Sequence, residues 1–487
     1  MLPHIKREGN TEVFYVADKP YIILGGEVHN SSASCLTYME DAVWQNLSEV
    51  NFNTLLVPVY WELVEPTQDC YDFSLPEGII NQARAHGKKL VFLWFGLWKN
   101  SRSTYAPEFI KRNADLFRVK DKYGKPVNVI SPFCTKAVEL DCKAFAAFMR
   151  WLFEYDGNDN TVITVQVENE IGLMDCDRDY GETADKLFSQ SVPAEISAMY
   201  GVGCWAEVFG GDAGDYFMAY YYALAVERIA SAGTKEYPLP MYINTWLVQT
   251  ENEAPGFPVT HLSGGPTHKV MDIWKAVSKT VFTLAPDIYL ENFACVCEHY
   301  SREDNTLLIP EAVNSIGAMA NALYAIGAGA VCFSPFGFED MGNTEAGRYL
   351  SEAYALIEGM TELIYDRRKT QNVTSFLQYR DNIHTFDFGG YNLRITYGAV
   401  SESTPPAAGL VICTGEGEYI ITGYGFDLEF INKEKAELDF LSVEEGRFKD
   451  GNWIAGRRLN GDETFSFKEV FSKKPVTLKI SVYTYNS

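Results

Sequence analysis

The stretch VITVQVENEIG, residues 162–172, decides the fold. It is a largely apolar run that ends directly in Glu168-Asn169-Glu170. Such a continuous run is typical of a parallel strand that is covered on both faces. Because side chains alternate along a regular strand, we expect Glu168 and Glu170 to share one face, with Asn169 on the other. The segment therefore predicts a buried strand that carries carboxyl groups at its C-terminal end.

Similar runs recur through the first 350 or so residues, with helical segments between them. They lie at 21–27, 54–60, 89–95, 240–246, 287–293, 306–311 and 329–336. Eight strand–helix units predict an α/β fold, a (β/α)₈ TIM barrel, whose active site is built at the C-terminal strand ends. Beyond residue 366 the pattern changes to alternating runs with glycine turns, typical of an antiparallel β-sandwich. The predicted domains are a catalytic barrel over 1–366 and a C-terminal β-sandwich domain over 367–487.

The charge balance excludes several function classes. The chain has 41 basic and 65 acidic residues, a formal net charge of −24. This charge repels a phosphate backbone and an anionic bilayer, so we expect neither nucleic acid nor a membrane as partner. The uncharged run at 312–338 is broken by polar residues and glycines, whereas a membrane span needs about 20 continuous apolar residues. It predicts a buried helix and a buried strand.

The N-terminal sequence and the cysteine spacing predict the localisation and the cofactor requirement. The opening MLPHIKREGNTEVFYV has no apolar run after its charges, so no secretory signal is predicted. The ten cysteines show no CxxC pair and no Cys/His metal spacing. We therefore expect reduced thiols, a cytoplasmic enzyme, and no metal or cofactor.

Two glutamates carry the predicted chemistry. Glu170 follows the strand at 162–168, and Glu311 closes TLLIPE at 306–311. Carboxyl groups at the C-terminal ends of two barrel strands meet at one mouth. A pair of this kind performs glycoside hydrolysis, in which one group protonates the leaving oxygen and the other attacks carbon or activates water.

Several segments resemble the clan A β-galactosidases of glycoside hydrolase family 35, in particular a bacterial branch of that family that carries a C-terminal β domain. The resemblance lies in VQVENEIG (165–172) and in residues 57–66, 93–101, 130–133, 263–266, 285–293 and 333–340. It implies a retaining, exo-acting β-galactosidase that removes terminal β-galactosyl residues from an oligosaccharide. It further implies that Glu170 is the general acid/base, Glu311 the nucleophile, and Asn169 a partner of the sugar 2-hydroxyl.

The sequence departs from this family at one place. Many members carry a Cys-Ala-Glu-Trp type segment after the third strand, whose glutamate reads galactose hydroxyls. Here the comparable segment is Phe95-Gly96-Leu97-Trp98, which has no carboxylate. Trp98, Lys99 and Asn100 would have to take over sugar recognition.

Further substrate-binding candidates stand at other predicted strand ends, and each has a structural alternative. Glu168 is a third site carboxylate or a group that fixes a neighbour. Tyr289 orients a site carboxylate or belongs to the core. The remaining candidates are polar or aromatic groups that either contact sugar hydroxyls and faces or cap and pack the strand ends: Glu27, His29, Asn30, Tyr60, Trp61 and Trp246.

Three alternatives stay open. A retaining β-glycosidase of the same fold with another sugar, a β-glucosidase, fucosidase or arabinosidase, fits the missing carboxylate. A non-catalytic carbohydrate-binding barrel is a second reading, and a transglycosylase a third. An assembly of identical chains is compatible with the sequence, which does not fix the oligomeric state.

Overall fold

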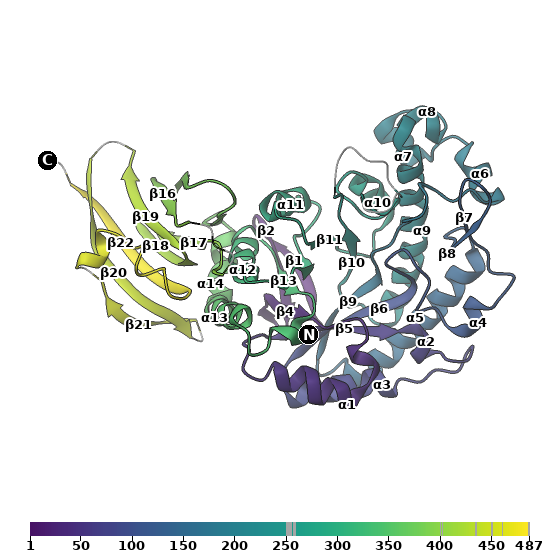
Figure 1. The fold of residues 1–487 in the computed structure, drawn as a ribbon, viewed down its shortest axis with the longest axis horizontal. Helices are drawn as coiled ribbons and strands as arrows, with labels where there is room; N and C mark the ends of the chain where they lie inside the picture. Colours follow the sequence, from purple (N-terminus) through teal and green to yellow (C-terminus); the bar gives the residue numbers. More distant parts are fainter. Residues whose placement is uncertain are drawn as a thin grey trace.

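Eight parallel strands close into a barrel, which confirms the predicted fold class (Figure 1). The computed structural model describes residues 1–249, 256, 260–399, 401, 403–433, 436–449, 451–459 and 461–485. Within these residues the barrel strands follow one another around the barrel in chain order. They are β4 (Ile23–Glu27), β5 (Thr54–Tyr60), β6 (Lys89–Lys99), β9 (Val162–Asn169), β10 (Met241–Trp246), β11 (Thr283–Ile288), β12 (Ile309–Ala312) and β13 (Cys332–Pro335).

One predicted strand is misplaced. The run at 287–293 was expected to be a strand, but β11 ends at Ile288 and helix α11 begins at Phe293. Tyr289, between them, is 46% exposed. The apolar letters of this run are therefore divided among a strand end, a loop and a helix, and a single-sequence pattern does not separate these three.

Helices follow the strands and cover the outside of the barrel. After β4 comes α1 (Leu36–Tyr38), which continues into a π-helical segment at Met39–Trp44. The other helices follow β5, β6, β9, β10, β11, β12 and β13 in turn: α2 (Trp61–Val64) and α3 (Ser74–Ala85); α4 (Glu108–Lys111) and α5 (Thr135–Asp156); α6 (Glu182–Phe188), α7 (Ala194–Tyr200), α8 (Trp205–Phe209) and α9 (Ala213–Glu236); α10 (Met271–Val277); α11 (Phe293–Tyr300); α12 (Ala318–Gly327); α13 (Glu345–Gly359) and α14 (Thr361–Arg368).

Two small sheets extend the barrel at opposite ends. An N-terminal sheet of β1 (His4–Glu8), β2 (Thr11–Val16) and β3 (Lys19–Pro20) meets it where the strands begin, since the Thr306 hydroxyl bonds to Glu12 just before β12. A hairpin of β7 (Arg118–Lys120) and β8 (Pro126–Ile130) lies in the long segment after β6.

The C-terminal region consists of antiparallel sheets that pack on the barrel helices (Figure 1). Successive residues of β17 face opposite ways: Val411 lies in the core between the two sheets, whereas Leu410 and Ile412 join the barrel-side core. The predicted boundary at 366/367 falls inside α14, and the division into domains stays a prediction. The six-stranded sheet contains β14 (Val373–Leu377), β17 (Ala408–Gly415), β18 (Glu418–Tyr424), β20 (Glu437–Lys449), β21 (Asn452–Arg458) and β22 (Val476–Tyr485); the other contains β15 (Ile383–Phe388), β16 (Tyr391–Tyr397) and β19 (Phe426–Asn432).

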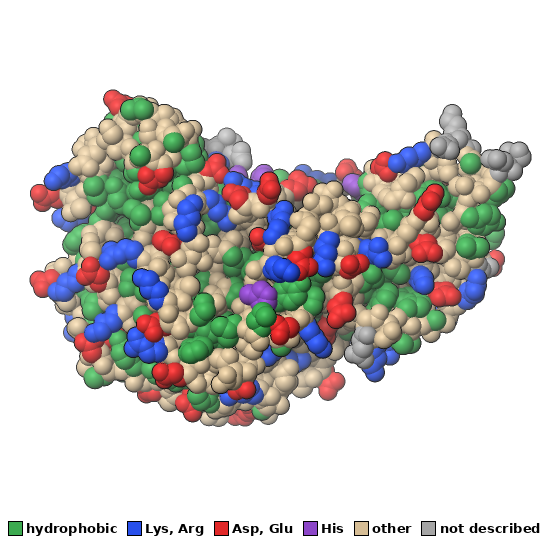
Figure 2. Space-filling view, turned by 180° about the vertical axis from the view of Figure 1, so that it is seen from behind, with side chains coloured by type: hydrophobic (Ala, Val, Ile, Leu, Met, Phe, Trp, Pro, Cys, Tyr) green, Lys and Arg blue, Asp and Glu red, His purple; other side chains and the backbone are tan. Residues whose placement is uncertain are grey.

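The described surface carries charges of both signs. Acidic and basic side chains are interspersed over the face in Figure 2. Among the helices that the structure describes, none is both long and apolar enough to cross a bilayer. All ten cysteines are free thiols.

Candidate active site

The end of β9 places its three polar residues differently from the prediction. Glu168 and Glu170 both have a positive φ, 61° and 41°, which regular strand residues do not adopt. The alternation therefore ends at Glu168. Its carboxylate accepts hydrogen bonds from the backbone N–H groups of Leu97 and Trp98, away from Glu170. The expectation that Glu168 and Glu170 share a face is wrong, and Glu168 lies behind the site.

Four carboxyl groups from different strand ends gather inside the barrel mouth. They are Glu27 at the end of β4, Glu170 directly after β9, Asp287 in β11 and Glu311 in β12. All are buried, with exposed fractions of 0%, 6%, 3% and 7%. Burial is the main cause that raises the pKa of each, and the charge on Glu311 further raises the pKa of the other three. Glu170 and Glu311, the predicted catalytic pair, thus meet in one electrostatic cluster.

The two glutamates of this pair have different surroundings. Burial and the nearby charge of Glu311 raise the pKa of Glu170 to about 8. The pKa of Glu311 is also raised by burial, but the ammonium of Lys99 and the hydroxyl of Tyr289 oppose that rise. The Tyr289 hydroxyl donates directly to the Glu311 carboxylate. This arrangement favours a protonated Glu170 beside an ionised Glu311.

Lys99 brings the positive charge into the cluster. It is the last residue of β6, 7% exposed, and its charge lowers the pKa of all four carboxyl groups. Its Nζ donates to Asn169 Oδ1 at 2.9 Å and lies 4.9 Å from the ring centre of Phe95. Because Lys99 takes the amide oxygen of Asn169, the Nδ2 of Asn169 is left to donate elsewhere.

Asn244 is a site residue that sequence reasoning missed, and Asp287 was not assigned to the site. Asn244 in β10 accepts from the backbone N–H of Glu170 at 2.9 Å and donates to Asp287 Oδ2 at 2.8 Å. Asn244 thereby fixes the backbone of Glu170 and a second carboxylate at once. The only signal was a polar residue near the end of the run at 240–246, which is weak without knowledge of the register.

Several buried polar atoms near this cluster have no hydrogen-bond partner among the described residues. Buried polar groups are normally paired, and an exception calls for an explanation. A ligand rich in hydroxyl groups would satisfy such atoms. Those near the strand ends are both carboxyl oxygens of Glu27, Asp287 Oδ1, Asn169 Nδ2, Asn30 Oδ1 and Asn100 Oδ1.

Other predicted residues stand at the rim of the mouth. His29 is 44% exposed, and its Nε2 lies 2.7 Å from Asp340 Oδ2. The Tyr60 hydroxyl donates to the carbonyl of Asn30 at 2.7 Å, which fixes the loop after β4. Trp246, half-buried, is the register partner of Asp287 across β10 and β11. The structure brings these residues to the edge of the carboxyl cluster.

Two predicted tryptophans are not brought into the site. Trp61 is fully buried and donates to Glu65 Oε2 at 2.8 Å. Trp98 is also fully buried, donates to the carbonyl of Ile130 at 2.9 Å, and meets the Tyr222 ring edge-on at 5.3 Å. Both side chains fill space between the barrel wall and outer elements. The expectation that they are platforms for a sugar ring is therefore corrected.

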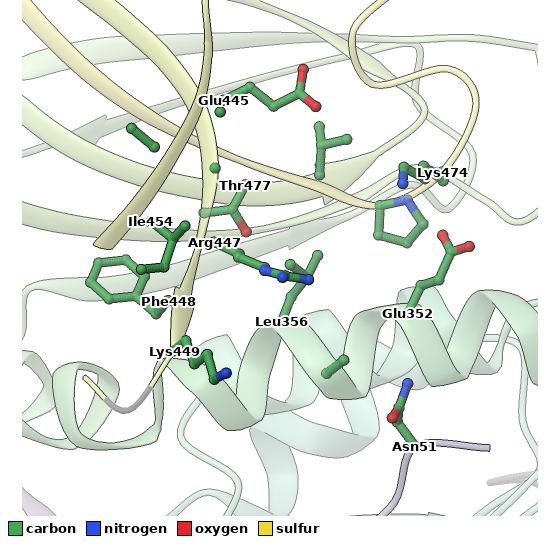
Figure 3. A pocket seen from close by; sticks show the side chains of 16 residues that line it. Asn51, Glu352, Leu356, Glu445, Arg447, Phe448, Lys449, Ile454, Lys474 and Thr477 are labelled. Carbon is green, nitrogen blue, oxygen red and sulfur yellow. The ribbon is translucent and has the colours of Figure 1, made fainter. Parts of the chain in front are cut away.

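One pocket adjoins the strand ends of the site, and a second pocket lies elsewhere in the molecule. A pocket of about 290 Å³ follows β10 and β11 directly, lined by 247–249, 290–292 and Tyr379 of the C-terminal region, so it adjoins Trp246 and Tyr289. A pocket of about 610 Å³ lies elsewhere, between α13 and the six-stranded sheet (Figure 3). Arg447, Leu356 and Phe448 line it, and none of the four clustered carboxyl groups does.

The described residues contain no candidate metal site. Among them, no group of three or more His, Cys, Asp or Glu side chains is arranged to hold a metal ion. The positive charge within the carboxyl cluster is that of Lys99.

Comparisons with known proteins agree with the architecture. Residues 350–471 match a family model described as a domain of unknown function, DUF5597. No curated protein matches the chain. Among solved structures it resembles the β-galactosidase from Rahnella sp. R3, at 12% identity and a TM-score of 0.53 over 74% of this chain and 58% of that one. It also resembles the β-galactosidase from Bacillus circulans sp. alkalophilus, at 14% and 0.52 over 71% and 57%.

The coverage and the sequence identity of these matches determine which conclusion they support. The chain spans less than two thirds of the length of both β-galactosidases, and its identity to them is low. The comparisons establish the TIM-barrel fold that these glycosidases share. The family resemblance noted in the sequence agrees with that fold.

Proposed function

We propose that the protein is a retaining glycoside hydrolase that removes a terminal β-linked sugar, most simply galactose, from an oligosaccharide. Glu311 attacks the anomeric carbon while Glu170 donates its proton to the leaving oxygen, so the glycosidic bond breaks as the ester bond to Glu311 forms. Glu170, now ionised, takes a proton from water, whose oxygen displaces Glu311 and releases the sugar. The second step restores both groups.

The observation that carries this proposal is the unequal environment of the two glutamates. An acid catalyst must hold its proton near neutral pH, and a nucleophile must be ionised. The pKa of Glu170 is raised to about 8, whereas Tyr289 donates to Glu311 and favours its charged form. Lys99 favours the charged form of both groups. The separation of roles thus follows from neighbouring groups and not from sequence order.

Sugar recognition is proposed to rest on the unpartnered atoms of the cluster. Lys99 supplies a cation directly after the segment in which the resembled family has a carboxylate, and Glu27 supplies a carboxyl group from the first barrel strand. Asn169 Nδ2 is free to donate to a sugar hydroxyl. The pocket beside Trp246 and Tyr289 would receive the leaving group, which is compatible with an oligosaccharide. The changed donor set leaves another β-linked sugar as the alternative.

A panel of nitrophenyl glycosides tests the reaction and the sugar together. We expect hydrolysis of the β-galactoside, and activity on a β-glucoside, fucoside or arabinoside instead would identify the alternative. The variant Glu170→Gln lacks the base for the second step, so an activated aryl glycoside should leave a sugar bound to the protein. Intact mass and peptide mapping should place it on Glu311. Inertness towards the whole panel, with no adduct in this variant, would contradict the proposal.

A further inference from the structure

A second pair of buried carboxyl groups lies outside the site, on the other side of the barrel wall. Asp141 of α5 and Glu168 of β9 are both fully buried and hydrogen-bonded to each other. Neither has an oxygen without a partner, in contrast to the cluster in the mouth. Two carboxylates in hydrogen-bond contact must have a proton between them, because two negative charges there would repel.

The donors around the pair show which member holds that proton. Asp141 Oδ1 accepts from Trp94 Nε1 at 2.9 Å, and Asp141 Oδ2 accepts from the backbone N–H of Leu97 at 3.0 Å. Both Asp141 oxygens are thus occupied by N–H donors, as an ionised carboxylate requires. Glu168 Oε2 accepts from the backbone N–H of Trp98 at 2.7 Å, whereas Oε1 receives only a longer contact of 3.3 Å from Leu97. Glu168 Oε1 is therefore the atom that carries the proton and donates it to Asp141.

The pair binds the backbone near the end of β6, at the residues just before Lys99. A side-chain carbon on Gly96 would lie 2.5 Å from Glu168 Oε1 and 2.6 Å from Asp141 Oδ2, so the carboxyl groups rest directly on the backbone there. The pairing of β6 with β9 is irregular between Trp94 and Lys99. The backbone N–H groups of this irregular segment are held by the pair, and the next side chain, Lys99, enters the cluster.

We infer that Asp141 and Glu168 share one proton, carried by Glu168, and act as positioning residues that set Lys99 against Asn169 and the catalytic carboxyl groups. This rests on the proposed function for its catalytic consequence, but not for the location of the proton. Glu65 is the further carboxylate whose charge reaches Asp141. Its own oxygens accept from Trp61 and from the backbone of Asp69, so it does not compete for the shared proton.

Two isosteric variants test the location of the proton. In Glu168→Gln the amide nitrogen replaces the protonated oxygen and donates to Asp141, so we expect an unfolding temperature close to that of the wild type. In Asp141→Asn the amide must turn its NH₂ towards either Trp94 Nε1–H or the Leu97 N–H, so one donor loses its acceptor. We expect this variant to lose several degrees of Tm. Equal losses in both variants, or a larger loss in Glu168→Gln, would overturn the assignment.

If Asp141→Asn does not fold, the number of protons released on unfolding still tests where the proton lies. Unfolding the wild type between pH 6 and 8 releases the proton of Glu168, and Glu168→Gln has none to release. The number of protons released, from the pH dependence of the unfolding free energy, should fall by about one in this variant. No change in that number would overturn the inference.

A double-mutant cycle tests the positioning role. Glu168→Ala removes the acceptor for the Trp98 N–H, and Lys99→Met removes the group being positioned. If Glu168 acts through Lys99, the loss in kcat/KM from Glu168→Ala should be several-fold smaller in the Lys99→Met background than in the wild type. Full additivity would mean that Glu168 does not act through Lys99 and would overturn the positioning role. A chain that hydrolyses no glycoside would refute the proposed function, while the proton count would still decide the pair.

Discussion

The segment at the end of β9 has buried carboxyl groups on both of its sides, and the two sides differ in how these groups are satisfied. Behind the wall, the Asp141–Glu168 pair accepts from three N–H groups, and each of its four oxygens has a partner. In the mouth, the cluster around Glu170 and Glu311 has carboxyl and amide atoms without partners among the described residues. The first arrangement is satisfied within the protein, whereas the second leaves polar atoms available to a ligand.

Burial alone does not distinguish a structural carboxyl group from a functional one in this barrel. Burial raises the pKa of Glu168 and of Glu170 alike, so a raised pKa alone does not mark a catalytic group. The difference lies in hydrogen bonding. Replacements in the mouth should therefore remove activity with little loss of stability. Replacements behind the wall that break a hydrogen bond should cost stability, and they should cost activity only through the position of Lys99.

The largest expected effect is at Glu311. Glu311→Gln removes the nucleophile but preserves the shape, and we expect kcat to fall on the order of 10⁴-fold or more. Thermal unfolding should change little, because the replaced carboxylate is stabilised only by Tyr289 and Lys99 at considerable desolvation cost. Near-normal turnover of the preferred aryl glycoside would contradict the assignment of Glu311.

Glu170→Gln should show an effect that depends on the leaving group. Loss of a general acid typically costs about 10²–10⁴-fold, and the cost falls when the leaving group needs no protonation. We expect a large loss of kcat/KM with a sugar as leaving group and a small one with dinitrophenol. A uniform loss across leaving groups would show that Glu170 does not donate the proton. In the wild type, kcat/KM should fall above about pH 8 as Glu170 ionises.

Lys99→Met should have an intermediate effect. It removes a charge-assisted hydrogen bond to Asn169, worth roughly 1.5–3 kcal/mol, so we expect a loss of about 10–100-fold in kcat/KM. Lys99 lowers the pKa of Glu170 and of Glu311, so its removal raises both. Both limbs of the pH profile should therefore move to higher pH. A profile that keeps its position would show that Lys99 does not act on the pair electrostatically.

The sequence could predict which residues stand at the strand ends, but not on which side of the barrel wall each side chain lies. A strand-end carboxylate needs only the run before it, so Glu170 and Glu311 could be identified at 162–170 and 306–311. The Glu168 side chain lies away from Glu170 because its backbone has a positive φ, which glutamate rarely adopts. No local sequence pattern predicts this conformation. Asn244 and Asp141 acquire meaning only through partners 74 and 44 residues away in the chain, Glu170 and Leu97.

Tyr289→Phe tests whether the tyrosine hydroxyl tunes the pKa of Glu311. The Tyr289 hydroxyl lowers the pKa of Glu311, so its loss raises that pKa and leaves less of the nucleophile ionised at low pH. We expect a loss of roughly tenfold in kcat/KM that is greatest on the acid side of the profile. A loss that is equal at all pH values would mean that Tyr289 contacts substrate and does not tune Glu311.

The smallest catalytic effect is expected at a tryptophan outside the mouth. Trp61→Phe leaves Glu65 Oε2 without its donor in a buried place, which should cost about 1–3 kcal/mol of stability and lower Tm while KM stays unchanged. Trp246→Phe is the matched change beside Asp287, where we expect KM to rise with Tm nearly constant. The two results should be opposite because one ring completes the packing of the barrel wall and the other borders the unpartnered groups. If Trp61→Phe raised KM instead, the ring would contact substrate after all, and hydrogen-bond satisfaction would not separate scaffold from site in this barrel.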